Sequence, residues 1–272
     1  MTKKLLNIGL NDPKGFWNII SKMNNWGKEK TDESDQIKPS TWKEYFTKLL
    51  NGPRDNDRTP NDRKSDNFLP TFNPILDRGI TMDELRKALL LLKNHKAPGC
   101  DRITAEYLKA FAESFGDILL KIIQNLFAKN VYPTDWTSNF LKPIFKKGEN
   151  VDPDNYRGLA IEAAMAKLHS LILLGRLTEF IKKKDLISAN QIGFMTCTSD
   201  HIFLLQAIIE KVVKKNKRKL YAVFIDFKKA YDTVDGGKLF RRLQTLGING
   251  IFLKNLKAMY ETISYKIKLK DG

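Results

Sequence analysis

The sequence predicts an α+β protein that is helix-rich and has a small antiparallel sheet. Several long stretches place apolar residues three and four positions apart, which is the spacing that gives a helix one apolar face. Three shorter stretches alternate or run continuously apolar, which is typical of strands. Hydrophobic residues make up 42% of the 272 residues, so the chain has enough apolar surface to form a folded core.

The first 67 residues are predicted to be a linker-like segment with short helices. Helical patterns cover Phe16–Met23 and Trp42–Leu50. The stretch Asn51–Asn67 contains two prolines, no large apolar residue and charges of both signs, as solvated linkers do. We therefore place a domain boundary there and assign residues 68–272 to one main domain.

The main domain is predicted to contain six or more helical stretches. Thr81–Lys93 begins with a capping box formed by Thr81 and Glu84. The other helical patterns are Thr104–Phe111, Ser114–Lys129, a stretch within Leu159–Lys183, Ser199–Lys215, Lys238–Leu246 and Ile251–Glu261. In Ser199–Lys215 the expected core face consists of Phe203, Leu204, Ala207 and Ile208.

The predicted strands are Asn139–Phe145, Lys219–Asp226 and Ile263–Leu269. The second has six consecutive apolar residues and ends in Asp226, so we expect a buried strand that carries a carboxylate at its end. Such a position suits a catalytic site, because the strand is rigid and its end faces solvent. The alternative is that Asp226 is only a cap or turn residue.

The charge balance points to a polyanionic partner. Lys and Arg number 47 against 31 Asp and Glu, for a net charge of +16. No apolar run approaches the roughly 18 residues of a membrane span, so nucleic acid is favoured and no membrane partner is expected. Cys100 and Cys197 are the only cysteines and the three histidines are scattered, which fits an intracellular protein without a nitrogen- or sulfur-ligated metal site.

One short segment concentrates positive charge. It holds six cations in nine residues, namely Lys211, Lys214, Lys215, Lys217, Arg218 and Lys219. We expect these side chains to contact a nucleic-acid backbone. A solvated basic turn is the alternative.

Five blocks along the chain resemble the reverse transcriptases of non-LTR (LINE-type) retrotransposons. They are FIDFKKAYDTV at 224–234, KAPGCDRI at 96–103, LKPIFKKG at 141–148 with Asn155-Tyr156-Arg157, the Lys167–Leu177 helix, and Gln191–Phe194 with Ser199 and Asp200. Trp42–Leu50 and Phe16-Trp17 resemble the segment that joins the endonuclease to the polymerase in these elements. The chain departs from the family pattern at Cys100, Arg102, Gly158, Met195 and Cys197.

The resemblance implies polymerase fingers and part of a right-hand palm. Asp226 would be the catalytic Mg²⁺ ligand, with the backbone carbonyl of Phe227, and the complete enzyme would hold two ions. Tyr231 would lie against the sugar of the incoming nucleotide and exclude a 2′-hydroxyl.

Further residues would bind the nucleotide or the template. Lys142, Lys146 and Arg157 would hold the triphosphate, and otherwise they are ordinary surface cations. Gln191, Gly193 and Phe194 would line the template or nucleotide side of the palm, and core packing is the alternative for Phe194.

The expected function is that of a fragment of an RNA-directed DNA polymerase. The family carries two adjacent aspartates on a later hairpin, and this sequence has no Asp-Asp pair. We therefore expect a fold truncated before that hairpin, weak single-site Mg²⁺ binding at most, and no activity of the isolated chain. Partners would be an RNA template, a DNA primer and deoxynucleoside triphosphates, in the nucleus or cytoplasm. The alternatives are a non-catalytic RNA-binding remnant of a transposable element and a group II intron maturase-like protein.

Overall fold

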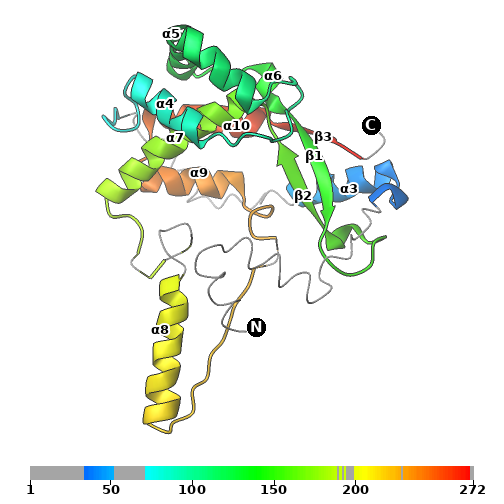
Figure 1. Ribbon diagram of the computed structural model, residues 1–272, viewed down its shortest axis with the longest axis vertical. Coiled ribbons are helices and arrows are strands. Elements are labelled where there is room, and N and C mark those ends of the chain that lie inside the picture. Colours follow the sequence, from blue (N-terminus) through cyan, green and yellow to red (C-terminus); the bar gives the residue numbers. More distant parts are fainter. Residues whose placement is uncertain are drawn as a thin grey trace, which may run out of the picture. The chain divides into compact units, whose positions relative to one another are not determined.

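The structure is a computed structural model that describes residues 34–51, 71–188, 190–191, 193, 199–227 and 229–269 (Figure 1). The α-helices are α3 (Pro39–Leu50), α4 (Met82–Leu91), α5 (Ala105–Lys129), α6 (Thr134–Thr137), α7 (Ala164–Lys183), α8 (Ser199–Ile209), α9 (Gly236–Thr245) and α10 (Gly250–Thr262). Shorter helical turns are η1 (Ser34–Gln36), η3 (Pro153–Asn155) and η4 (Glu210–Lys215), of which η4 is a π-helix. The predicted helices from Trp42 onward are confirmed, and α9 and α10 begin within two residues of their predicted starts.

The described residues form two compact units. Unit 1 comprises the described parts of Met1–Tyr45, Leu141–Leu159 and Ile267–Gly272. Unit 2 comprises the described parts of Phe46–Phe140 and Ala160–Lys266. The predicted helix Phe16–Met23 and most of the predicted linker Asn51–Asn67 lie outside the described residues, so the domain boundary stays a prediction.

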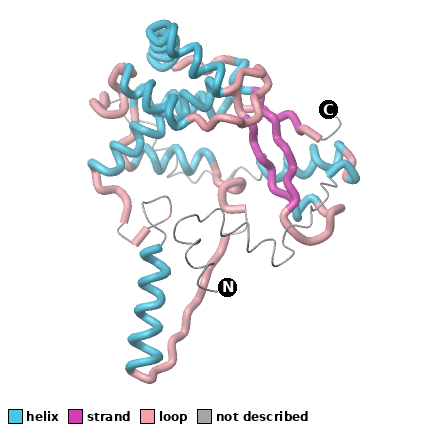
Figure 2. Tube along the Cα trace, in the orientation of Figure 1, coloured by secondary structure: helices cyan, strands magenta, loops and turns pink. Residues whose placement is uncertain are grey.

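Three strands form one sheet in the order β2–β1–β3 (Figure 2). They are β1 (Ser138–Phe145), β2 (Tyr156–Ile161) and β3 (Ser264–Ile267). The loop of residues 146–155 turns the chain back along β1, so β1 and β2 form an antiparallel hairpin.

β3 runs in the same direction as β1. The Ser264 hydroxyl donates to the Thr137 carbonyl, and four residues later the Lys268 N–H donates to the Leu141 carbonyl. The sheet is therefore mixed, and the expectation of a wholly antiparallel sheet is wrong for β3. The reason is the connection: β3 follows α10, so it is not constrained by a short turn to run against β1.

The core of unit 2 lies between α4, α5, α7 and α10. Its most buried apolar side chains include Leu76, Ile80, Leu85, Leu119, Ile123, Leu168 and Phe252. The predicted capping box of α4 is present, since Thr81 and Glu84 exchange side-chain and backbone hydrogen bonds. α5 joins the two helices predicted on either side of residue 112 across a kink at Phe115, whose φ is −129° and ψ 32°.

Arg176 of α7 is a buried charged residue whose hydrogen bonds connect the segment before α4 to the core. Its side chain has no exposed area, and it donates to the backbone carbonyls of Leu76, Arg78 and Gly79 at 2.6–3.0 Å. It also forms a two-point pair with the Glu84 carboxylate, at 2.8 and 2.9 Å. Arg176 therefore joins α7 both to the turn at residues 76–79 and to the first turn of α4.

The same turn also caps α10. The Asp77 carboxylate is buried and accepts the N–H groups of Asn73 and Phe252, at 2.8 and 2.9 Å. Phe252 lies in the first turn of α10, where backbone N–H groups lack partners within the helix. Gly250 has φ +69°, and a Cβ atom there would lie 2.5 Å from an Asp77 carboxylate oxygen. Glycine is therefore required by both backbone conformation and space.

The segment from α8 to Asp226 does not match its predicted burial. Phe203 is 73% exposed, Leu204 54% and Ile208 39%, so the expected core face of this helix is wrong. Residues 217–227 have no regular secondary structure, and Ile225 is 80% exposed, so the predicted buried strand Lys219–Asp226 is also wrong. A strand needs a neighbour to pair with its backbone groups, and within the described residues the sheet contains only β1, β2 and β3.

Candidate functional site

The β1–β2 hairpin divides its side chains between a packed face and an exposed face. The Lys146 N–H donates to the Asn155 carbonyl at 2.9 Å, which fixes the register of the two antiparallel strands. This register places Arg157 opposite Ile144 on the same side of the hairpin. Because side chains alternate along a strand, Lys142 and Lys146 point to that side as well. The structure therefore brings the three predicted triphosphate-binding cations, Lys142, Lys146 and Arg157, to one face of unit 1.

The opposite face is fixed by aromatic packing within unit 1. Tyr156 of β2 is buried and meets Phe145 edge to face, with ring centroids 5.2 Å apart. Trp42 of α3 is fully buried and also meets Tyr156 edge to face, with ring centroids 4.9 Å apart. The Trp42 indole N–H donates to the Ser34 carbonyl at 3.1 Å. The cationic face is thus presented by a hairpin whose other side is anchored.

The loop of the hairpin is closed by its own polar groups. Gly148 has φ +98°, and a Cβ atom there would lie 2.5 Å from the Asn155 amide. The Asn155 amide donates to the Glu149 carbonyl at 3.1 Å, and the Tyr156 hydroxyl donates to the Asn150 carbonyl at 2.7 Å. The glycine that ends the LKPIFKKG block is therefore required by the turn.

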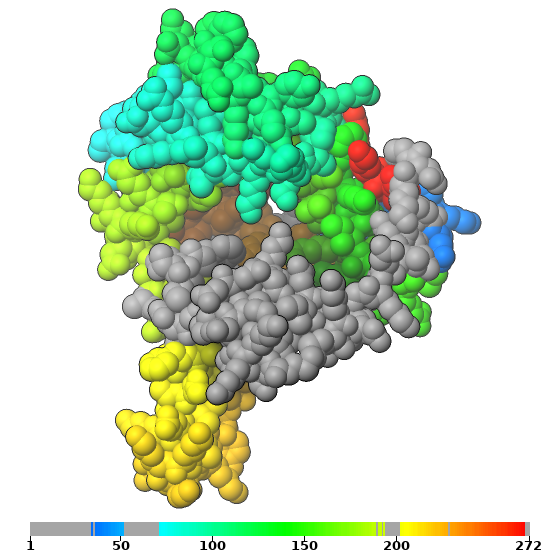
Figure 3. All heavy atoms as spheres, viewed as in Figure 1, coloured from blue at the N-terminus to red at the C-terminus, as the bar shows by residue number. Residues whose placement is uncertain are grey.

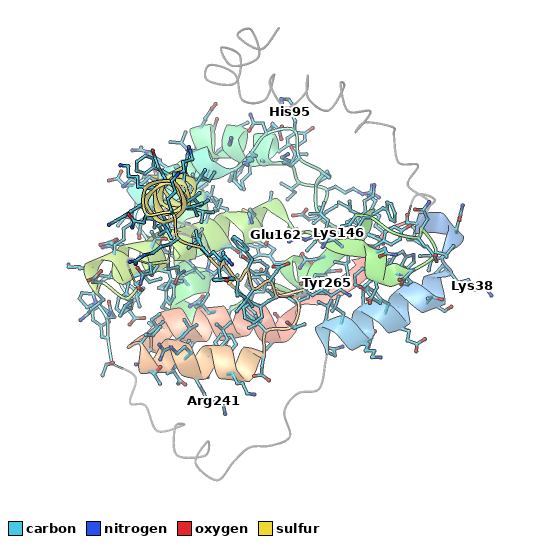
Figure 4. All side chains as sticks on the ribbon, turned by 90° about the horizontal axis from the view of Figure 1, so that it is seen from below. Lys38, His95, Lys146, Glu162, Arg241 and Tyr265 are labelled. Atoms are coloured by element: carbon cyan, nitrogen blue, oxygen red, sulfur yellow. The ribbon has the colours of Figure 1, made fainter. Side chains whose placement is uncertain are left out.

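The exposed face carries Arg157 and Lys146 at the surface, with Lys142 half-buried (Figure 4 labels Lys146). Ile144 and Leu159 are the apolar residues of this face, at 44% and 48% exposed. Guanidinium and ammonium groups on one rigid face suit a polyphosphate, because each forms charge-assisted hydrogen bonds to phosphate oxygens.

The KAPGCDRI loop is held against the start of α7 in unit 2. A Cβ atom on Gly99 would lie 2.7 Å from the Ala163 backbone, so only glycine allows this approach. Arg102 has φ +60°, and its N–H donates to the Gly99 carbonyl at 3.1 Å. The family pattern has glycine at this position, and the left-handed backbone gives the physical reason for that preference.

Asp226 lies in the exposed, irregular part of unit 2. Residues 221–227 have no regular secondary structure, and both Asp226 and Phe227 are exposed. The structure does not give the carboxylate the rigid strand end that the sequence predicted. Asp226 belongs to unit 2 and the three hairpin cations to unit 1, so their predicted roles in one nucleotide site stay predictions.

Tyr231 lies on a tight turn that follows Asp226. The Lys229 carbonyl accepts the N–H groups of Asp232 and Thr233, at 3.0 and 3.2 Å, and Tyr231 is 68% exposed. Asp235 then caps α9 by accepting the Lys238 N–H at 2.6 Å. The turn is therefore well defined and presents the Tyr231 ring at the surface.

Two residues near this turn were not expected from the sequence. Burial raises the pKa of the Tyr265 hydroxyl, and the negative charges of Glu162 and Asp232 and the hydroxyl of Tyr260 raise it further. Glu162 also pairs with Lys167 at 2.9 Å, and it adds to the effect of burial in raising the pKa of Tyr132 to about 12. Glu162 and Tyr265 come from segments 103 residues apart and belong to no motif, so no sequence signal could have singled them out.

The remaining predicted nucleotide or template residues are only partly described. The Gln191 N–H donates to the Ser188 carbonyl at 2.9 Å, and its side chain is exposed. Gly193 is exposed, and a Cβ atom there would have no neighbouring atom within 4 Å. Phe194 lies outside the described residues. Their predicted roles therefore stay predictions.

The predicted nucleic-acid-binding cations are all exposed. Lys211, Lys214 and Lys215 lie on η4, and Lys217, Arg218 and Lys219 follow its cap residue Asn216. The Arg218 N–H donates to the Val212 carbonyl at 2.9 Å, and Lys217 adopts φ +52°. These features turn the chain sharply after η4, and six cations lie at the surface around this turn.

The described part of the chain contains no cluster of metal-ligating side chains. Nowhere in it do three or more His, Cys, Asp or Glu residues gather in a way that could hold a metal ion. The role of Asp226 and the Phe227 carbonyl as Mg²⁺ ligands therefore stays a prediction. Among the same residues, no helix combines the length and apolarity needed to cross a bilayer.

Comparison with known proteins identifies relatives over most of the chain. The family described as "Reverse transcriptase (RNA-dependent DNA polymerase)" matches residues 144–270. The "Transposon TX1 uncharacterized 149 kDa protein" of Xenopus laevis is 27% identical over 198 residues, which are 71% of this chain and 15% of that protein. The "Retrovirus-related Pol polyprotein from type-1 retrotransposable element R2" of Popillia japonica is 29% identical over 175 residues, 63% of this chain and 23% of that protein.

A third relative is the "RNA-directed DNA polymerase from mobile element jockey" of Drosophila melanogaster. It is 24% identical over 160 residues, which are 57% of this chain and 17% of that protein. The chain thus spans less than a quarter of the length of each of these three relatives. The family match includes β2, Asp226 and Tyr231; three of the five blocks found in the sequence lie wholly within it, and the block at 96–103 lies outside it. The chain is therefore related to the reverse transcriptases of non-LTR retrotransposons.

Proposed function

We propose that the chain is part of an RNA-directed DNA polymerase that adds deoxynucleotides to a primer 3′ end under the direction of an RNA template. The observation that carries this proposal is the cationic face of the β1–β2 hairpin, where Lys142, Lys146 and Arg157 lie together. The resemblance implies the same three residues as the triphosphate-binding fingers. The proposed setting is the nucleus or cytoplasm.

The hairpin supports triphosphate binding through its charge and rigidity. Arg157 offers a planar guanidinium that can donate two parallel hydrogen bonds to one phosphate, whereas each lysine acts as a compact positive charge. The packed side, built on Trp42 and Tyr156, holds the strands in place, so little backbone order has to be gained on binding.

Tyr231 is proposed to select deoxynucleotides. Its ring is exposed at the surface of a turn closed by the Lys229 carbonyl. A ring placed against the sugar of an incoming nucleotide would collide with a 2′-hydroxyl and not with a 2′-hydrogen. Gln191, Gly193 and Phe194 are proposed to complete the template or nucleotide side.

Asp226 is proposed as the one catalytic carboxylate of this chain, with the Phe227 carbonyl beside it. When bound, Mg²⁺ supplies charge stabilisation for phosphoryl transfer, and two ions are needed to stabilise both the attacking and the leaving oxygen. A single exposed carboxylate offers at most weak binding of one ion. We therefore propose that the 272-residue chain does not extend primers by itself.

The test of the proposed function measures nucleotide binding and extension separately. Titration with a fluorescent deoxynucleoside triphosphate should show binding that Arg157→Ala weakens about tenfold or more, because a charge-assisted pair is lost. Lys183→Ala, which removes an exposed cation of α7 in the other unit, should leave this binding unchanged. Equal binding by wild type and Arg157→Ala would contradict the proposal.

Primer extension on an RNA template tests the second half of the proposal. With Mg²⁺ and all four deoxynucleotides, the pure chain should give no extended product. Robust extension by the 272-residue chain would overturn the claim that it is inactive alone.

A non-catalytic RNA-binding role is the second candidate. The observation in its favour is that the six cations of residues 211–219 are exposed while Asp226 lies on irregular backbone. This role predicts RNA binding that weakens steeply with salt, is unchanged by Asp226→Ala, and occurs without binding of deoxynucleoside triphosphates. Loss of nucleotide binding in Arg157→Ala would instead favour the polymerase role.

A further inference from the structure

The turn after η4 forms a shallow hollow in unit 2 that combines positive charge with an aromatic ring. Its lining residues are Val213, Lys217, Arg218, Lys219, Leu220 and Tyr221. Three of these are cations and three have apolar or aromatic side chains. The atoms of this region, yellow to orange in Figure 3, lie at the surface.

Tyr221 is the most open side chain of this hollow. It is 85% exposed, whereas Val213 and Leu220 beside it are 41% and 36% exposed. An exposed tyrosine next to three cations can offer one face of its ring to a flat ligand.

The backbone fixes where the three cations stand. The Arg218 N–H donates to the Val212 carbonyl at 2.9 Å, and the Asn216 N–H donates to the Lys211 carbonyl at 3.1 Å. Between them Lys217 takes a left-handed conformation with φ +52°. The charges are therefore attached to a hydrogen-bonded turn immediately before Tyr221.

We propose that Tyr221 is a stacking platform for one base of a single-stranded nucleic acid, whose backbone is held by Lys217, Arg218 and Lys219. Proteins that bind single strands combine a cationic track with aromatic rings on which bases stack. A duplex keeps its bases stacked on one another, so it cannot offer a free base face to the ring. This proposal deepens the proposed function and rests on it for RNA as the partner.

The cations and the ring should make separable contributions. The cations interact with phosphates, and neutralising three phosphates of a single strand gives a slope of about −2 in a plot of log affinity against log salt concentration. Stacking on an aromatic ring is independent of salt and of base identity, and it raises affinity about fivefold to a hundredfold.

The experiment is fluorescence anisotropy with a labelled single-stranded RNA of about 12 nucleotides, within the usual site sizes of single-strand binders, over a range of salt concentrations. Tyr221→Ala should weaken binding at least about fivefold at every salt concentration and leave the salt slope unchanged. Tyr221→Phe should keep the wild-type affinity, because the ring and not the hydroxyl is used. The triple variant Lys217→Ala, Arg218→Ala, Lys219→Ala should make the salt dependence shallower, reducing the magnitude of the negative slope by about 2.

Two controls separate stacking from general effects. Tyr107→Ala removes another tyrosine of unit 2, on α5 and 73% exposed, and should leave binding unchanged. An oligonucleotide of the same length without bases should bind wild type and Tyr221→Ala equally. Absence of RNA binding by wild type, equal RNA binding by Tyr221→Ala, or an equal loss with the base-free strand would each overturn the proposal.

The outcomes also separate this inference from the proposed function. If Tyr221→Ala loses RNA affinity while Arg157→Ala keeps nucleotide binding, the polymerase role fails and the stacking site stands. If Arg157→Ala loses nucleotide binding and Tyr221→Ala binds RNA as wild type does, the stacking site alone fails.

Discussion

The helical core of unit 2 and the segment from α8 to Asp226 both contain long apolar stretches, yet their environments are opposite. In the core, Leu85 and Ile123 are fully buried, whereas Phe203 and Ile225 of the segment are 73% and 80% exposed. Apolar sequence alone therefore does not decide burial. An apolar side chain is buried only where a neighbouring helix or strand offers an apolar face to pack against.

The two regions also differ in the burial of their charged side chains. Arg176 is buried in the core, and its guanidinium donates to the carbonyls of a single turn and to the carboxylate at the start of α4. Arg218 and Asp226 of the segment are exposed to solvent. Substitutions in the first region should therefore change the free energy of unfolding much more than those in the second.

The largest effect is expected for Arg176→Ala. The substitution leaves the Glu84 carboxylate and three backbone carbonyls without their buried donor, so the free energy of unfolding should fall by about 3–5 kcal/mol. Urea denaturation followed by circular dichroism measures this change. Arg218→Ala is the matched control and should change stability by less than about 0.5 kcal/mol. Similar losses in both variants would refute the contrast between the regions.

His169 should make the core sensitive to mild acid. It is 1% exposed, and burial, followed by the charge of Arg176, lowers its pKa from 6.5 to about 4. Between these pH values the unfolded chain binds a proton that the folded histidine does not, so stability should fall by up to about 3 kcal/mol as pH decreases from 6.5 to 4. Urea denaturation at half-unit pH steps measures this loss, and His169→Leu should flatten the curve in that window.

Glu84 provides a control in a different window. Burial raises its pKa, but hydrogen bonds from Arg176 and the Thr81 N–H and the charges of Arg176 and Arg78 outweigh burial and lower the pKa from 4.5 to about 2. Its contribution is therefore present above pH 4.5 and lost as pH falls toward 2. Glu84→Gln should leave the slope between about pH 5 and 6.5 as in wild type. A flat profile for wild type in that range would contradict the assignment to His169.

Two glycines of unit 2 should respond in opposite directions to alanine. Gly250→Ala forces a Cβ atom to within 2.5 Å of the Asp77 carboxylate at φ +69°, and should cost about 1–3 kcal/mol. Gly175→Ala on α7 meets no atom within 4 Å and should stabilise the helix by about 0.5–1 kcal/mol. Thermal denaturation of both variants measures the difference. A stabilising Gly250→Ala would show that Asp77 does not cap α10 closely.

The elements that the sequence predicted well are those determined by nearby residues. The capping box at Thr81 and the apolar spacing of α5 and α7 require only contacts within one helix, and both are found. Local rules were sufficient for these helices. Lys142 and Arg157 share a face because they lie on adjacent strands of one hairpin, but β2, which carries Arg157, was not among the predicted strands.

The features that the sequence missed depend on partners distant in the chain. The direction of β3 is set by its contacts with Thr137 and Leu141, more than 120 residues earlier. The role of Asp77 as a cap of α10 spans 175 residues. The predicted strand at Lys219–Asp226 required a neighbouring strand to pair with, and an apolar run does not specify such a neighbour. Without the strand, Asp226 lacks the rigid support that was expected for it.

The smallest effect is expected at Ile225, and it distinguishes the predicted buried strand from the observed exposed segment. Ile225→Ser in a buried strand would cost several kcal/mol, because a large apolar side chain would be lost from a core. The side chain is 80% exposed, so the substitution should change the free energy of unfolding by less than about 0.5 kcal/mol in urea denaturation. Ile123→Ser, at a fully buried position of α5, should cost at least about 3 kcal/mol and serves as the reference. If Ile225→Ser lowered the free energy of unfolding about as much as Ile123→Ser, residues 219–226 would be buried in solution, as the apolar run predicts for a strand.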